Sequence, residues 1–102
     1  MPTYVVLSNW TDQGIRNVRS TVERVDGVTR LAEKYGASVA QIYWTVGPYD
    51  FVSIVEAPDD EAATAFALEI SSGGNVRTTT LRAYDRDAMS GIIERMGPSA
   101  GT

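Results

Sequence analysis

The sequence contains no histidine and no cysteine. Without imidazole or thiol groups, the chain lacks the usual ligands of transition metals and the usual partners of an activated nucleophile. The absence of cysteine also excludes disulfide bonds, so a cytoplasmic location is the default expectation. We therefore expect neither a metal site nor another cofactor. Catalysis by carboxylates, phenols or guanidinium groups alone stays open.

Long apolar runs and clustered positive charge are missing as well. No stretch approaches the roughly 20 apolar residues that span a bilayer, and the N-terminus lacks the pattern of a secretion signal. The net charge is −4, and the nine Lys and Arg residues are scattered along the chain. Nucleic-acid binding requires several phosphates to be neutralised at once, so we expect neither nucleic acid nor a membrane as a partner. A chain of 102 residues, 43% hydrophobic, fits one globular domain.

The stretch Gln41–Glu56 predicts two strands joined by a tight turn. In residues 41–46, side chains with a polar group (Gln41, Tyr43, Thr45) alternate with more apolar ones (Ile42, Trp44, Val46). This is the period of a strand with two unlike faces. Phe51–Val55 is a denser apolar run, typical of a central strand that is covered on both sides. Between them, Gly47-Pro48-Tyr49-Asp50 combines residues that each favour a turn for a separate physical reason.

The rest of the chain supplies further strands and helices. A single helix over residues 11–35 would be about 37 Å long, well beyond the roughly 23 Å of a seven-residue strand. Ser20 and Glu23 have the spacing of a capping box, which divides this region in two. The predicted elements are a strand over Thr3–Asn9, a helical turn over Asp12–Val18, a helix over Thr21–Tyr35, a helix from the cap Asp59 to Gly73-Gly74, a strand over Asn75–Tyr84 and a helix over Asp85–Met96.

The element order β-α-β-β-α-β predicts an α+β, ferredoxin-like domain over residues 1–85, followed by a C-terminal helix and frayed tail over residues 86–102. Right-handed crossovers place both helices on one face of a four-stranded antiparallel sheet with strand order 4-1-3-2. The main helix has a predicted buried face. It consists of Val22, Val25, Val28, Leu31, Ala32 and Tyr35.

Alternation along the strands yields two sets of side chains, and neither is polar enough to face water. The sets are Val5, Leu7, Val52 and Ile54 on one side and Tyr4, Val6, Tyr43, Phe51 and Val55 on the other. Whichever set faces away from the helices leaves a contiguous apolar patch. We therefore expect a second copy of the chain to cover it, in a homodimer or higher homo-oligomer.

Several segments resemble a known family. Gly47-Pro48-Tyr49-Asp50 resembles the G-x-Y-D signature of the GYD domain. The segments 56–60 and 74–77 are similar to two other recurring parts of that family, and Gly14-Ile15 fits its early part. The resemblance covers about residues 3–84 and leaves residues 85–102 outside it. It implies a ferredoxin-like chain that pairs into a dimeric α+β barrel, and it implies no established activity.

Strand directions bring distant segments to one edge of the predicted sheet, where the first two strands end and the last two begin. This edge gathers Asn9, Trp10, Thr45, Tyr49, Asp50, Asn75 and Arg77. With Tyr43 as a further residue of the barrel interior, we interpret this set as a candidate ligand site. Structural roles are open for the same residues: Asp50 as a turn cap, Asn75 as a loop anchor, and Arg77 as an ion-pair partner of Asp50 or Glu56.

Three functions remain open from these residues. The leading hypothesis is a non-catalytic homo-oligomeric barrel that binds a small organic molecule or serves as an accessory subunit. The first alternative is a cofactor-independent enzyme for an aromatic or polyketide-like substrate, with Asp50 as general acid or base and Tyr49 orienting the substrate. The second is a purely structural assembly unit. A ligand cavity of about 300 Å³ or more would favour binding or catalysis.

Overall fold

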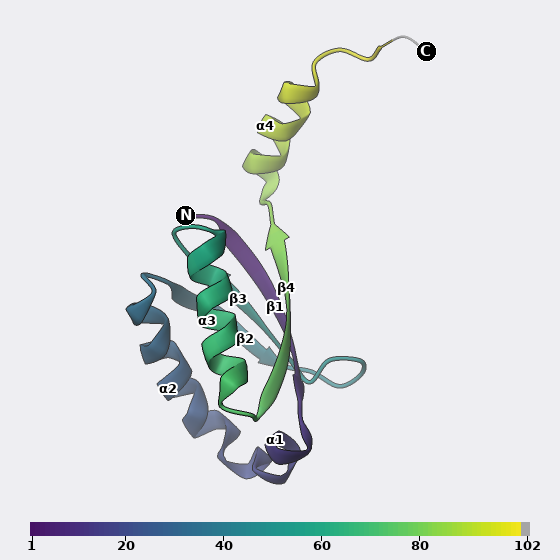
Figure 1. The fold of residues 1–102 in the computed structure, drawn as a ribbon. Coiled ribbons are helices and arrows are strands. Elements are labelled where there is room, and N and C mark those ends of the chain that lie inside the picture. Colours follow the sequence, from purple (N-terminus) through teal and green to yellow (C-terminus); the bar gives the residue numbers. More distant parts are fainter. Residues whose placement is uncertain (101–102) are drawn as a thin grey trace.

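The computed structural model describes residues 1–100, and its elements follow the predicted order (Figure 1). They are β1 (Thr3–Trp10), α1 (Asp12–Arg16), the 3-10 turn η1 (Val18–Ser20), α2 (Thr21–Lys34), β2 (Ser38–Trp44), β3 (Phe51–Glu56), α3 (Asp60–Ser72), β4 (Val76–Ala83) and α4 (Arg86–Met96). The largest difference from the predicted boundaries is at β2, which begins three residues before Gln41. None of the helices within residues 1–100 is long and apolar enough to cross a membrane.

The four strands form one antiparallel sheet in the order β2-β3-β1-β4. This is the predicted order 4-1-3-2 read from the opposite edge. Helices α2 and α3 lie on one face of the sheet, and no helix of residues 1–100 covers the other face (Figure 1). We call the uncovered side the bare face. The predicted pairing of two sheets into a barrel involves a second chain and stays a prediction.

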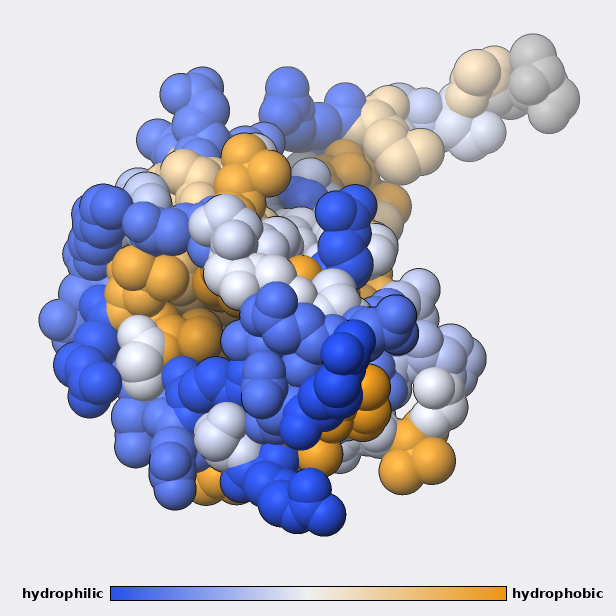
Figure 2. All heavy atoms as spheres, turned by 60° about the horizontal axis from the view of Figure 1, so that its bottom comes forward, coloured by the Kyte–Doolittle hydropathy of each residue, from blue (hydrophilic) through white to orange (hydrophobic). Residues whose placement is uncertain are grey.

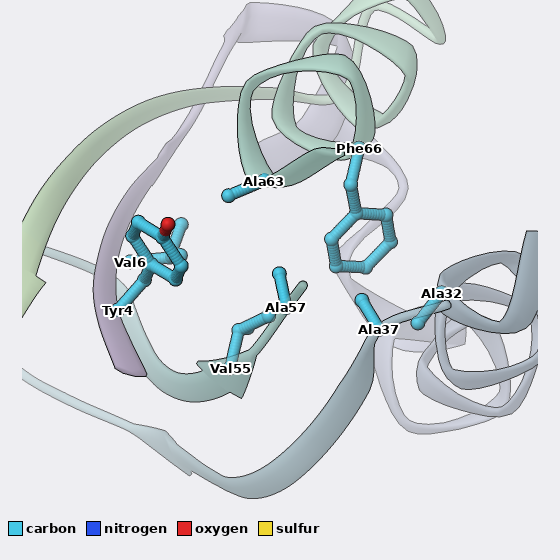
Figure 3. Close-up of a cluster of buried hydrophobic side chains, with 8 residues drawn as sticks. All are labelled: Tyr4, Val6, Ala32, Ala37, Val55, Ala57, Ala63 and Phe66. Carbon is cyan, nitrogen blue, oxygen red and sulfur yellow. The ribbon is translucent and has the colours of Figure 1, made fainter. Parts of the chain in front are cut away.

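The core lies between the sheet and the two helices. Figure 3 shows its side chains converging from β1, β3 and the helices, and they are Tyr4, Val6, Ala32, Ala37, Val55, Ala57, Ala63 and Phe66. Four of these eight are alanines, so the core is thin. Tyr4 is only 3% exposed, and its hydroxyl donates to Asp60 Oδ1 at 2.5 Å across the first turn of α3.

The predicted grouping of Tyr43 with Tyr4 and Val6 is wrong. Tyr43 is directly opposite Val52, so it lies on the bare face. The cause is the register across the turn: Trp44 pairs with Phe51, so Tyr43 pairs with Val52 and shares the face of Leu7. A change of one residue in such a register reverses the face of every side chain in the strand. The β-bulge between Val39 and Gln41 lies before Tyr43 and leaves this pairing unchanged.

The predicted capping box at Ser20 is also wrong. Ser20 has φ −97° and ψ 9°, whereas a capping residue normally has extended backbone. Its hydroxyl instead donates to the Asn17 carbonyl at 3.0 Å, because η1 runs directly into α2. The predicted cap of α3 is confirmed: Asp59 Oδ1 accepts the Ala62 amide at 2.8 Å. Val22, expected on the buried face of α2, is 67% exposed.

Helix α4 continues from the end of β4 and projects away from the rest of the molecule (Figure 1). Asp85 caps it by accepting the Ala88 amide at 2.8 Å. None of its residues is buried, and Met89, Ile93 and Met96 are all exposed.

Candidate functional site

The predicted edge cluster forms around the turn that links β2 to β3. Asp50 joins this turn to the end of β1 through two hydrogen bonds: its amide donates to the Ser8 carbonyl at 2.9 Å, and its Oδ2 accepts the Trp10 amide at 2.8 Å. The Asp50 carboxylate therefore satisfies a backbone donor where the ladder of β1 ends. This geometry corresponds to a turn-capping role.

Asn9 and Thr45 hold the same turn from its two sides. Asn9 Nδ2 donates to the Pro48 carbonyl at 2.7 Å. Thr45 uses its hydroxyl to donate to the Tyr49 carbonyl at 2.6 Å and its amide to donate to the Asp50 carbonyl at 2.8 Å. The cluster thus consists of hydrogen bonds that fix the backbone of the turn.

Asn75 lies in the loop before β4, where it anchors α1. Its carbonyl accepts the Thr11 amide at 3.0 Å, and its Oδ1 accepts from Gln13 Nε2, also at 3.0 Å. The Thr11 hydroxyl adds a bond to the Gly74 carbonyl at 2.5 Å and accepts the Gly14 amide at 3.1 Å. The short helix α1 is therefore tied closely to the loop between α3 and β4.

Arg77 and Tyr43 make no side-chain hydrogen bond to the turn within residues 1–100. Arg77 is opposite Asn9 in the sheet and, like the 58% exposed Tyr43, belongs to the bare face. The ion pair found within residues 1–100 is Lys34–Glu69, so the expected pairing of Arg77 with Asp50 or Glu56 does not occur in this part of the chain. The structure thus joins the turn residues by hydrogen bonds and places Arg77 beside Asn9, on the bare face that Tyr43 shares.

A groove lies elsewhere, between α2 and α3 at the end of the sheet where β1 ends and β4 begins. Its volume is about 270 Å³. Figure 2 brings this end of the molecule forward and shows apolar side chains set between hydrophilic ones. The lining residues are Trp10, Thr21, Arg24, Val25, Gly27, Val28, Leu31, Glu69, Ile70, Asn75 and Val76. Two predicted site residues, Trp10 and Asn75, therefore line this groove.

The groove continues toward the core. Val25, Val28 and Ile70 line both the groove and a small internal cavity of about 30 Å³ beneath it. The sheet side of this cavity carries the buried hydroxyls of Ser8 and Ser53, which are 2% and 8% exposed. Space for a ligand therefore exists on the helix-covered side of the sheet, within a single chain.

Two charged residues, Glu69 and Arg24, line the groove, and they have different hydrogen-bond partners. Glu69 accepts from Lys34 Nζ at 2.9 Å and from the Tyr35 hydroxyl at 2.8 Å. The hydrogen bond from Lys34, and then that from Tyr35, lowers the pKa of Glu69, and the same carboxylate raises the pKa of both partners. Arg24 is half-buried, and its Nη2 donates to the Asn17 carbonyl. The groove thus has a charge-compensated carboxylate on α3 and a guanidinium on α2.

The residues of α2 that form this groove were not identified as a site from the sequence. Neither Arg24 nor Gly27 belongs to the candidate site expected from the sequence. A glycine within the apolar stripe of a helix was the available signal, because glycine is unfavourable there. Within residues 1–100, no group of three or more acidic side chains is placed to hold a metal ion.

The fold and the groove define a small α+β protein with helices on one face of a four-stranded antiparallel sheet. The chain belongs to the GYD domain family, whose model matches residues 4–93. The resemblance found in the sequence is thereby confirmed, and the match extends into α4, beyond the expected limit at residue 84.

Two similar proteins come from Thermus thermophilus. One is named "Glutamine synthetase and cystathionine beta-lyase binding protein" and is 40% identical over 84 residues, which cover 81% of this chain and 88% of the relative. The other is the solved crystal structure of TTHA0845, with a TM-score of 0.53 and 31% identity over 84% of this chain and 100% of that chain. The two findings support the fold and the family of this chain.

Proposed function

We propose that this chain is a non-catalytic accessory protein that works as a homo-oligomer in the cytoplasm and binds other proteins. The observation that carries the proposal is the bare face of the sheet, an apolar surface left uncovered by every helix in the described part of the chain. The name of the Thermus relative, which describes a protein that binds two enzymes, supports the same reading.

The bare face is apolar across three strands. Leu7 lies between Val52 of β3 and Thr79 of β4, and Val5 lies between Ile54 of β3 and Leu81 of β4. The apolar surface extends onto β2 through Tyr43, which is opposite Val52. A continuous apolar surface of this kind is characteristic of protein interfaces.

A second copy of this chain is the occupant that we propose for the bare face. A two-fold pairing places the same surface on both sides, so each apolar side chain of one copy meets an apolar surface of the other. This arrangement is the dimeric α+β barrel expected from the sequence. In the proposed assembly, the enzymes bind the outer surface of the dimer.

The chemistry of the turn supports a non-catalytic role. The Asp50 carboxylate accepts the Trp10 amide, so it is held by the backbone at the end of β1. Neither histidine nor cysteine is present to serve as an alternative base or nucleophile.

Sedimentation equilibrium tests the homo-oligomer, with Val52→Glu as the variant. We expect the wild-type protein to sediment as a dimer or larger and the variant as a folded monomer, because a charge at the centre of the apolar face is costly to bury. Val22→Glu is the matched control, since Val22 is exposed on α2 and the change should leave the mass unaltered. A wild-type protein that remains monomeric at high concentration would refute the homo-oligomer.

Partner binding is tested separately by adding purified glutamine synthetase or cystathionine beta-lyase from the same organism. We expect at least one of the two enzymes to co-sediment with the wild-type protein at a fixed stoichiometry. If neither enzyme bound, the proposed partners would be refuted, and the result on self-association would stand.

A further inference from the structure

We infer that the groove between α2 and α3 binds a small organic molecule with one carboxylate and an apolar body. This site goes beyond the proposed protein-binding role and does not depend on it, because all of its lining residues come from one chain. Three features support this site: the shape of the groove, the open space beside Gly27 and the positive charge of Arg24.

The shape fits a compact ligand. Small-molecule sites start at about 300 Å³, and the groove offers about 270 Å³ with the internal cavity as a further recess. Val25, Val28 and Leu31 are only half-buried, although they form the apolar stripe of α2. An apolar body in the groove would remove these side chains from water, which is favourable in proportion to the area covered.

Gly27 lies in the wall of the groove. Apart from its own helical turn, no heavy atom of residues 1–100 lies within 4 Å of a Cβ added to Gly27, so close packing does not require glycine at this position. Inside a helix, glycine is less favourable than every other residue except proline. Gly27 lines the groove, so the open space beside it belongs to the groove, and a large side chain at this position would fill it.

Arg24 sets the charge of the ligand. The spacing of Arg24, Val28 and Leu31 places them on one face of α2, and all three line the groove. The bond from Nη2 to the Asn17 carbonyl orients the guanidinium plane, and a planar guanidinium is suited to a carboxylate. Arg24 and Glu69 are the charged residues among those that line the groove, and Glu69 is paired with Lys34, so Arg24 is the partner for a ligand carboxylate.

The recess below the groove limits the far end of the ligand. A cavity of about 30 Å³ has room for about one water molecule. The buried hydroxyls of Ser8 and Ser53 lie on its sheet side. The end of the ligand opposite the carboxylate must therefore be small, and a methyl or hydroxyl group suits it.

Isothermal titration calorimetry with two probes of equal length tests this inference. Octanoate carries the carboxylate, and octanamide carries a neutral amide on the same chain. We expect octanoate to bind the wild-type protein about tenfold or more tightly than octanamide, as a charge-assisted hydrogen bond to Arg24 requires. In Arg24→Met, both probes should bind with the weaker affinity.

Two variants of Gly27 locate the site. Gly27→Leu fills the groove and should abolish binding of both probes, whereas Gly27→Ala adds a methyl group that meets nothing and should retain octanoate binding. Circular dichroism confirms that each variant is folded. Equal affinity for the two probes would overturn the role of Arg24. Octanoate binding that survives Gly27→Leu, or no binding of octanoate to the wild-type protein at millimolar concentration, would overturn the site.

Discussion

Gly14 lies so close to Asn75 that a Cβ on Gly14 would be 1.9 Å from the Asn75 carbonyl oxygen. The contact joins α1 to the loop before β4, two segments about sixty residues apart in the sequence. Backbone atoms form both sides of it, so no side-chain rotation can relieve an added methyl group. Glycine is therefore required at position 14 by packing.

The first prediction concerns this contact. Gly14→Ala should lower the free energy of unfolding by about 3 kcal/mol or more, at the upper end of what overpacking costs. Urea denaturation measures the change. Gly27→Ala is the matched control: it should raise stability by about 1 kcal/mol, because it improves helix propensity without a clash. Equal effects of the two substitutions would contradict the close approach.

The second prediction concerns Asp50. Asp50→Ala removes the acceptor of the Trp10 amide at the end of β1 and should cost about 1–3 kcal/mol of stability. Asp50→Asn retains an acceptor oxygen and should cost less than half as much. Urea denaturation of the three proteins gives this ranking. If both variants were as stable as the wild type, the capping role would be wrong and a chemical role for Asp50 would gain support.

The third prediction concerns alkaline pH. Burial, together with the hydrogen bond to Asp60, raises the pKa of Tyr4 to about 12 from its ordinary value of 10. As the pH rises, Tyr4 loses its proton in the unfolded chain before it does so in the folded one. The contribution of protonated Tyr4 to the free energy of unfolding is therefore present below pH 10 and is lost as the pH rises toward 12. The loss should amount to about 2 kcal/mol.

Thermal unfolding of the wild type and of Tyr4→Phe between pH 8 and pH 12 tests this predicted loss of stability. The variant lacks the ionisable group, so the difference in stability between the two proteins should shrink above pH 10. Other groups, including Lys34 and Tyr35 with their raised pKa values, titrate equally in both proteins. Parallel curves across the whole range would refute the assignment to Tyr4.

The fourth prediction concerns α4. This helix has no buried residue and projects from the end of β4, so a chain that ends at Asp85 should fold with an unchanged free energy of unfolding, within about 0.5 kcal/mol. Urea denaturation at low protein concentration measures this. A marked loss of stability would show that α4 packs against the domain or against a second copy, and that residues 1–85 are not an independent unit.

Much of the fold follows from local patterns. A dense apolar run identified β3, and turn chemistry identified the turn at Gly47–Asp50. The Asp59 cap marked the start of α3 because its hydrogen bond closes within three residues. Element order and the handedness of crossovers then predicted the strand order. The same reasoning brought Asn9, Thr45 and Asp50 to one edge, since strand direction alone determines which ends meet.

The sequence by itself determined the elements, their order and the family, because each of these depends on residues near one another or on the direction of whole strands. Only the tertiary structure decided which way Tyr43 faces, since the register between β2 and β3 sets which of their residues are opposite each other. It also decided that α2 and α3 stand apart beside Gly27 and leave a groove. The separation of two packed helices depends on side chains from both helices and the sheet together, and no single stretch of sequence encodes it.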